Sequence, residues 1–138
     1  MFGRKKRKTP LPVVFEAAPD IYKLAVVLIK KLQFDFIEPN QIKCVRSKNS
    51  KSRAYARIWS VPRIFLETLK MKPAYIIEVL AHYFDKLSEE EKTKVIIHEL
   101  LHIPKTFSGA LKSHRGRYHH VDRREVQRWF DKISPPVG

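Results

Sequence analysis

Cysteine is nearly absent from this chain, with Cys44 as the only one in 138 residues. A disulfide framework of the kind that holds small secreted domains together is therefore excluded, and a metal site closed by paired thiolates is not expected. Cys44 lies in the strand-like segment 42–45, where we expect a small buried hydrophobic residue. A single cysteine suits a reducing compartment, so the sequence predicts a cytoplasmic protein.

Long hydrophobic runs are also missing. No apolar stretch approaches the roughly 20 residues that a membrane-spanning helix needs. The basic residues 4–8 resemble the start of a secretory signal, but residues 9–12 contain two prolines, and Glu16 follows, so no apolar signal core is present. Neither a secretory signal nor a membrane partner is expected.

The length and the hydrophobic fraction of 43% are ordinary for one folded domain. We assign the domain to residues 13–134. Residues 1–12 form a basic segment containing prolines, which is predicted to be a disordered tail.

Acidic residues are scarce, with 14 Asp and Glu against 28 Lys and Arg, and the net charge is +14. Such a balance predicts attraction to polyanions, although a merely solvated basic surface is the alternative. Segments 41–46 and 53–59 are predicted strands that could pair as a hairpin around a polar loop. Six basic residues with no acid among them make this hairpin a candidate surface for nucleic acid or nucleoprotein: Lys43, Arg46, Lys48, Lys51, Arg53 and Arg57.

The strongest motif is His98-Glu99-Leu100-Leu101-His102, an H-E-x-x-H pattern inside an apolar run. On a helix, His98 and His102 lie one turn apart on the same face, the spacing at which two imidazoles can bind one Zn²⁺. Glu99 is placed to act as a general base toward a metal-activated water. Three polar side chains among buried apolar ones need partners, and a metal ion would satisfy all of them.

Both ends of the helix that carries this motif have recognisable sequence signals. Ser88 followed by Glu91 forms a capping box, and the acids of the first turn favour the positive end of the helix dipole. Pro104 is expected to end the helix, because a proline disfavours helical backbone at the residue before it.

Two helical histidines need a third ligand, and the chain must turn back after Pro104 to provide it. Gly109 supplies backbone freedom for this return, so His114 is the predicted third ligand. His119 and His120 compete with it, and Glu125 lies behind them. A catalytic site would leave the fourth position to water. His82 is expected instead to be a half-exposed strand residue.

The remaining pattern predicts an α+β fold. We expect a helix from Pro19 to Leu32, a short helix over 62–70, a strand over 74–84 and a final helix over 121–133. In the short helix, Ile64, Phe65, Leu66 and Leu69 are expected to pack inward. In the strand, Glu78 and His82 are expected to share a face.

With these elements in place, the chain resembles the small putative metallopeptidases of archaea and phages, a minimal zincin-like group related to the SprT-like proteases. Segments 98–104 and 107–111 with His114 carry the likeness, and segments 54–59 and 84–88 add to it. The resemblance implies a three- to four-stranded sheet packed on two helices, with the substrate lying along the sheet edge. It also implies zinc ligands at His98, His102 and His114, with Glu99 as the base.

The longer H-E-x-x-H-x-x-G-x-x-H pattern of metzincins is missing, so that subclass does not apply. Nor does the chain show an obvious group to stabilise the transition state. Tyr118, His119 and His120 are the nearby candidates, and the sequence does not decide among them.

The leading hypothesis is a zinc peptidase acting on an extended or unfolded polypeptide. The alternative is a basic nucleic-acid-binding protein whose metal site is structural. A third hypothesis is a zincin-like protein without catalysis that serves as a partner or scaffold. The sequence makes no prediction of the substrate, the cleavage preference or the oligomeric state.

Overall fold

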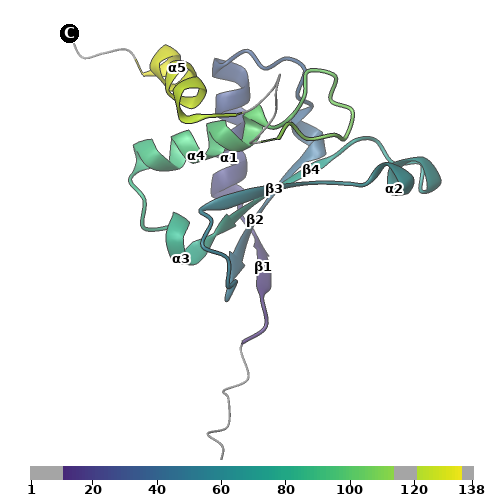
Figure 1. The fold of residues 1–138 in the computed structure, drawn as a ribbon, viewed down its shortest axis with the longest axis horizontal. Helices are drawn as coiled ribbons and strands as arrows, with labels where there is room; N and C mark the ends of the chain where they lie inside the picture. Colours follow the sequence, from purple (N-terminus) through teal and green to yellow (C-terminus); the bar gives the residue numbers. More distant parts are fainter. Residues whose placement is uncertain (1–10, 114–120, 135–138) are drawn as a thin grey trace, which may run out of the picture.

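The computed structural model describes residues 11–113 and 121–134 and confirms the α+β class (Figure 1). Its strands are β1 (Val14–Ala17), β2 (Ile42–Lys48), β3 (Ala56–Ser60) and β4 (Tyr75–Leu80). Its α-helices are α1 (Pro19–Lys31), α2 (Arg63–Thr68), α3 (Ala81–Phe84), α4 (Glu89–Leu101) and α5 (Arg123–Ile133), and a 3₁₀ turn, η1 (Pro39–Gln41), precedes β2. In the described part of the chain, no helix is long and apolar enough to cross a bilayer.

The strands form one four-stranded sheet in the order β1-β2-β4-β3. β2 and β4 run parallel in the centre, and β1 and β3 are antiparallel edge strands. The predicted hairpin of β2 and β3 is therefore wrong, because β4 lies between them. β4 is buried at five of its six positions, as expected of a central strand with a neighbouring strand on each side, and this burial outweighs the local tendency of neighbouring strands to pair.

Two details of the sheet also differ from the prediction. β1 was not predicted, since its four residues are all exposed and give no burial pattern. β4 ends at Leu80, whose N–H donates to the Tyr55 carbonyl at 3.0 Å, and the chain then turns into α3. His82 is thus an exposed helical residue and shares no strand face with Glu78.

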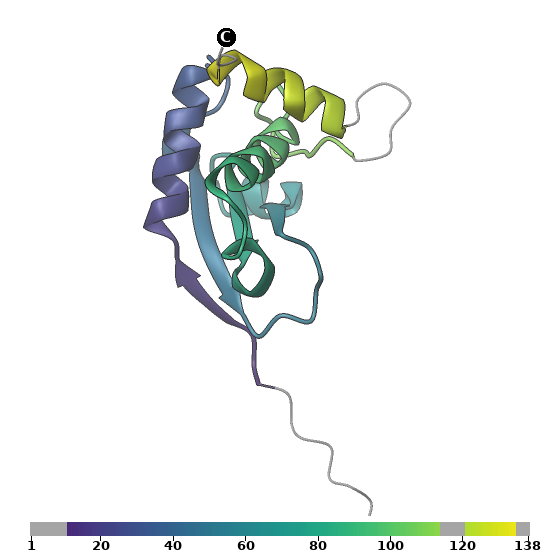
Figure 2. The ribbon, with the colours of Figure 1, turned by 90° about the vertical axis from the view of Figure 1, so that its left-hand side faces the viewer.

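The core lies between one face of the sheet and the helices α1, α4 and α5. Alternate residues of β2 and β4 point into it, and α1 and α4 contribute apolar residues at helical spacing. Figure 2 shows α5 lying over α4 and reaching the end of α1, where Trp129 packs edge-on against Phe34 at a centroid distance of 4.8 Å. The fully or nearly fully buried members include Ile21, Ala25, Leu28, Ile42, Cys44, Tyr75, Ile77, Val79, Ile96, Ile97 and Leu100.

Cys44 is buried as predicted, and burial raises the pKa of its thiol to about 12. α2 departs from the prediction, because Leu66 packs inward but Ile64, Phe65 and Leu69 are 70%, 51% and 61% exposed. The helix has only six residues and projects from the end of the sheet (Figure 1), so only one side of it meets the rest of the chain.

A buried carboxylate ties the edge strand β3 to β4. Glu78 is fully buried, and its carboxylate accepts hydrogen bonds from Arg57 at 3.2 and 3.0 Å and from the Trp59 indole N–H at 2.8 Å. Burial alone raises the pKa of Glu78, but the hydrogen bonds, with Arg57 the strongest donor, outweigh it and hold this pKa below its usual value of 4.5.

Because the folded-state pKa of Glu78 is depressed, its contribution to stability is present above 4.5 and is lost as the pH falls further through the folded value. We expect Glu78→Gln to cost on the order of 2 kcal/mol at neutral pH, the size of hydrogen bonds to a charged group, and to flatten the acid limb of the stability profile. Urea unfolding at a series of pH values measures both effects. Glu67→Gln removes an exposed carboxylate paired with Arg63 and should change stability by less than about 0.5 kcal/mol.

Candidate metal centre

The helix α4 presents the motif as its sequence predicts. The Ser88 hydroxyl accepts from the Glu91 N–H at 3.1 Å, which confirms the cap. The regular helix ends at Leu101, and His102 is its C-cap residue in right-handed helical conformation. The last turn tightens, because the His102 N–H donates to the Glu99 carbonyl at 3.1 Å. The one-turn spacing of the two histidines is kept.

The two imidazoles face each other. Nε2 of His98 and Nε2 of His102 are 3.2 Å apart. Nδ1 of His102 is hydrogen-bonded to the Lys112 carbonyl, so this nitrogen carries the proton and Nε2 keeps its lone pair. Two nitrogens bound to one tetrahedral zinc ion lie about 3.3 Å apart. The spacing of this pair and the tautomer of His102 fit a shared zinc ion.

Residues 103–112 form the return loop, and hydrogen bonds to Tyr75 and His102 hold its second half in place. The Lys112 N–H donates to the His102 carbonyl at 2.7 Å, so Lys112 is bound to His102 through both of its backbone groups. The buried Tyr75 hydroxyl donates to the Ala110 carbonyl at 2.8 Å and accepts from the Gly109 N–H at 2.9 Å. Gly109 has φ +95°, a conformation that glycine adopts without strain, and this confirms its predicted role in the turn.

Removing the Tyr75 hydroxyl is expected to loosen this loop. Tyr75→Phe leaves a donor on Gly109 and an acceptor on Ala110 unpaired, which should cost about 1–3 kcal/mol in urea unfolding and weaken zinc binding. Tyr22→Phe is the matched control, because the Tyr22 hydroxyl makes one long bond of 3.2 Å to the Pro39 carbonyl, which is not part of the return loop. An unchanged zinc affinity in Tyr75→Phe would contradict the proposed support of His102 by the loop.

The predicted third ligand is not tested. His114, Tyr118, His119 and His120 lie outside the described residues. Among residues 11–113 and 121–134, no group of three His, Cys, Asp or Glu side chains could hold a metal ion, so Glu125 in the first turn of α5 does not complete the pair.

Glu99 lies beside the histidine pair and is only 5% exposed. Burial raises the pKa of its carboxyl to about 7 in the metal-free chain. A cation held by the histidines would favour the ionised form and lower that pKa. The carboxyl is then ionised at neutral pH, the form that can accept a proton from water.

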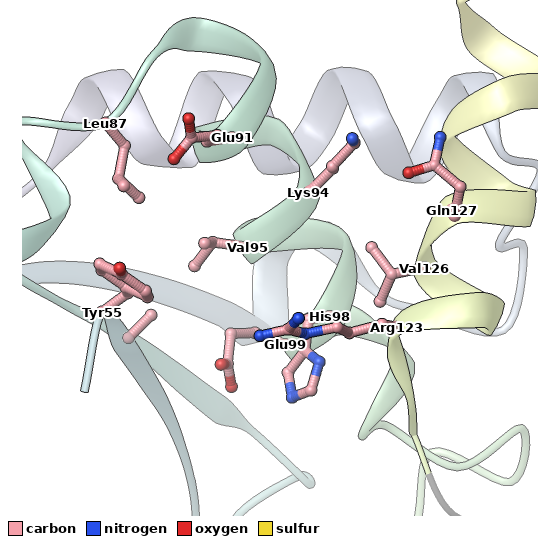
Figure 3. Close-up of a pocket in the computed structure, with 11 residues that line it drawn as sticks. Tyr55, Leu87, Glu91, Lys94, Val95, His98, Glu99, Arg123, Val126 and Gln127 are labelled. Carbon is pink, nitrogen blue, oxygen red and sulfur yellow. The ribbon is translucent and has the colours of Figure 1, made fainter.

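Two hollows adjoin the motif. A cavity of about 550 Å³ is lined by residues of α4 and α5 and the start of β3, with His98 and Glu99 in its wall (Figure 3). A second cavity of about 460 Å³ is lined by β3, the return loop, His102 and Glu99. Ala56 and Glu99 line both cavities, so the two hollows meet at the candidate base.

Among the strands of residues 11–113 and 121–134, none pairs with the outer edge of β3, which lies beside this site. The bond from the Leu80 N–H to the Tyr55 carbonyl identifies 55 and 80 as a hydrogen-bonded pair of the antiparallel ladder. Bonded and non-bonded pairs alternate in such a ladder, so Ala56, Ile58 and Ser60 direct their backbone N–H and C=O groups away from β4. An extended peptide could bind to these groups.

The six basic residues do not gather on a hairpin. Arg46 donates to Asp20 at 2.9 Å and to Asp85 at 3.1 Å, Arg57 is held by Glu78, and Lys48 pairs with Glu16 at 3.2 Å. The acids that pair with them come from other parts of the chain, which the local sequence did not reveal. A role for Lys43, Lys51 and Arg53 or their neighbours in nucleic-acid binding stays a prediction.

Sequence reasoning missed several residues of the larger cavity, notably Tyr55, Val95, Arg123 and Val126. Val95 precedes His98 by three positions, so the sequence spacing was sufficient to predict that both lie on the same face of the helix. Arg123 is exposed, and its side chain lines the cavity. The docking of α5 against α4, which brings Arg123 and Val126 to the site, has no signal in local sequence.

Comparison with protein families gives a match to a family model described as putative phage metallopeptidase, which aligns with residues 13–132. The aligned region includes all of β1 to β4 and α4 and most of α5. No curated protein and no solved structure matches the chain.

Proposed function

Since this chain belongs to the family described as putative phage metallopeptidases, we propose that it is a zinc peptidase acting on extended polypeptides. His98, His102 and His114 hold the zinc ion, and Glu99 is the general base. The observation that carries this proposal is the pair of Nε2 atoms at 3.2 Å, with His102 oriented by the Lys112 carbonyl and Glu99 buried beside them.

The return loop supports His114 as the third ligand. Lys112 is fixed to His102 through its own N–H and C=O groups. Residue 114 is two positions further along the chain, so its Cα lies within about 7 Å of the Lys112 Cα. This short distance along the chain makes His114 a candidate for completing the pair. His119 and His120 lie further along the chain and are the competing candidates.

The chemistry divides between the metal and the protein. Zinc, when bound, supplies Lewis acidity that polarises the scissile carbonyl and makes water a nucleophile near neutral pH. Glu99 takes a proton from the attacking water and returns it to the leaving amide nitrogen. Glu99 lines both cavities, which supports a path in which a peptide bond passing between them would lie beside it.

The edge of β3 supports a polypeptide substrate. The outward backbone groups of Ala56 and Ile58 would pair with an extended peptide, adding a strand to the sheet. Such pairing recognises the backbone rather than one sequence, so it suits unfolded or flexible segments. The neighbouring cavities then receive substrate side chains.

The test is hydrolysis of denatured casein and of a mixed peptide library by the full chain. We expect cleavage with one zinc ion bound per chain, loss of cleavage after chelation, and recovery when zinc is returned. A folded, zinc-loaded chain that cleaves neither substrate would refute the peptidase assignment.

A further inference from the structure

The larger cavity beside the motif has walls that are mainly apolar near the candidate base. Figure 3 shows Leu87, Val95 and Val126 directed toward its interior, with the Tyr55 ring beside them. These residues come from four separate parts of the chain, the segments before β3 and α4 and the two helices themselves. A volume of about 550 Å³ lies within the range of pockets that hold small organic groups, so a large side chain fits.

The cavity also touches the reacting centre. His98 and Glu99 line it, and Val95 lies one helical turn before His98 on the same face. Ala56, whose backbone groups point to the outer edge of β3, lines it as well. A peptide that follows this edge past Glu99 therefore brings the side chain of a residue next to the scissile bond to the mouth of the cavity.

The lining also contains the charged residues Glu91, Lys94 and Arg123. Glu91 and Lys94, with the uncharged Gln127, lie on the side of the cavity opposite Glu99 (Figure 3), and Arg123 is an exposed residue of the wall. Lys94 is already occupied, because its ammonium pairs with Glu90 at 3.3 Å and lies 4.9 Å from the centre of the Phe130 ring. Between Val95 and Val126 the walls are apolar, so a charged group placed there would lose hydration, whereas an apolar side chain would gain contacts.

We propose that this cavity is a specificity pocket for a bulky apolar side chain, such as Leu, Met or Phe, of the substrate residue next to the cleaved bond. The inference rests on the proposed peptidase function and names its substrate class. Tyr55, Val95 and Val126 determine the preference. Each methylene that enters an apolar pocket changes kcat/KM by about 10-fold or more, so Phe should be preferred over Ala by at least about 10²-fold.

The experiment compares peptides that differ only at this residue, with cleavage sites in a peptide library read by mass spectrometry. Val126→Phe fills the pocket and should reverse the preference toward Ala and Gly by more than about 10-fold, with zinc content unchanged. Val126 is 7% exposed, so Tyr55→Ala is a second variant at a 49% exposed position that is safer for folding. Tyr55→Ala removes one wall and should reduce the Phe-to-Ala ratio by about 10-fold. Phe65→Ala, an exposed aromatic change on α2, is the control and should leave the ratio unchanged.

Binding to zinc-loaded Glu99→Gln protein gives a readout that does not need catalysis. Fluorescent peptides with Phe at the tested residue should bind about 10-fold or more tightly than those with Ala. Cleavage with no side-chain preference, or a preference that neither variant alters, would overturn the pocket proposal and leave the peptidase function standing. Absence of cleavage together with selective binding would refute the peptidase function but keep the pocket, and absence of both would refute the two together.

Discussion

Replacing Glu99 by Gln is expected to lower kcat/KM for peptide hydrolysis by about 10³-fold, while the chain still folds and binds one zinc ion. Gln has nearly the same shape as Glu and lies in the same buried position, but its amide cannot accept the proton of water. The measurement combines a peptide assay with zinc analysis of the same preparation. Full zinc content together with wild-type kcat/KM would show that Glu99 is not the base.

A matched substitution separates this effect from a general loss of negative charge on α4. Glu89 lies in the first turn of the same helix, exposed and paired only weakly with Lys92 at 3.5 Å. Glu89→Gln should keep kcat/KM within about twofold of wild type, because surface pairs contribute little.

The same Glu99→Gln change is expected to stabilise the zinc-free chain above neutral pH. Burial raises the pKa of Glu99 to about 7 from 4.5, so ionising it in the folded state opposes folding. The contribution of the protonated Glu99 to folding stability is complete below pH 4.5 and is lost as the pH rises through about 7. Gln does not ionise, so it avoids this loss. The expected gain at about pH 8 is on the order of 3 kcal/mol, with no gain at about pH 4. Urea unfolding with a chelator present measures it; equal stability at both pH values would contradict the burial argument.

The second large effect is expected from His102→Ala, which should abolish stoichiometric zinc binding and hydrolysis together. His102 is 2% exposed, and its Nδ1 is already oriented by the Lys112 carbonyl. Losing an outer partner of a metal ligand costs about 10–100-fold in affinity, and losing the ligand itself should cost more. Calorimetric titration with zinc measures the affinity.

Thermal unfolding provides the control for that substitution. Zinc stabilises whichever state binds it, so it should raise the Tm of wild type and leave that of His102→Ala unchanged. His82→Ala removes an exposed imidazole on α3 and should behave as wild type. A zinc-dependent Tm in His102→Ala equal to that of wild type would exclude His102 as a ligand.

Features set by local chemistry were predictable from the sequence. The Ser88 cap, the one-turn spacing of His98 and His102, and the left-handed turn at Gly109 depend on neighbouring residues, and the structure confirms each of them. The helix α5 was equally predictable, because its apolar residues recur at the spacing of one helical face.

Features set by distant partners were not predictable in this way. The insertion of β4 between β2 and β3 follows from its burial in the centre of the sheet, which two adjacent strand patterns do not reveal. The sequence around Glu78 did not indicate that its carboxylate forms an ion pair with Arg57 of the neighbouring strand β3. The exposure of Ile64 and Phe65 likewise reflects where α2 projects, since their apolar character alone predicted the opposite.

The most direct test of the account is X-ray absorption spectroscopy at the zinc edge on the zinc-loaded full chain, compared with His114→Ala. We predict three imidazole nitrogens and one further light atom at about 2.0–2.1 Å, falling to two imidazoles in the variant. A first shell that lacks the imidazole pair would contradict the claim that His98 and His102 hold the metal beside Glu99.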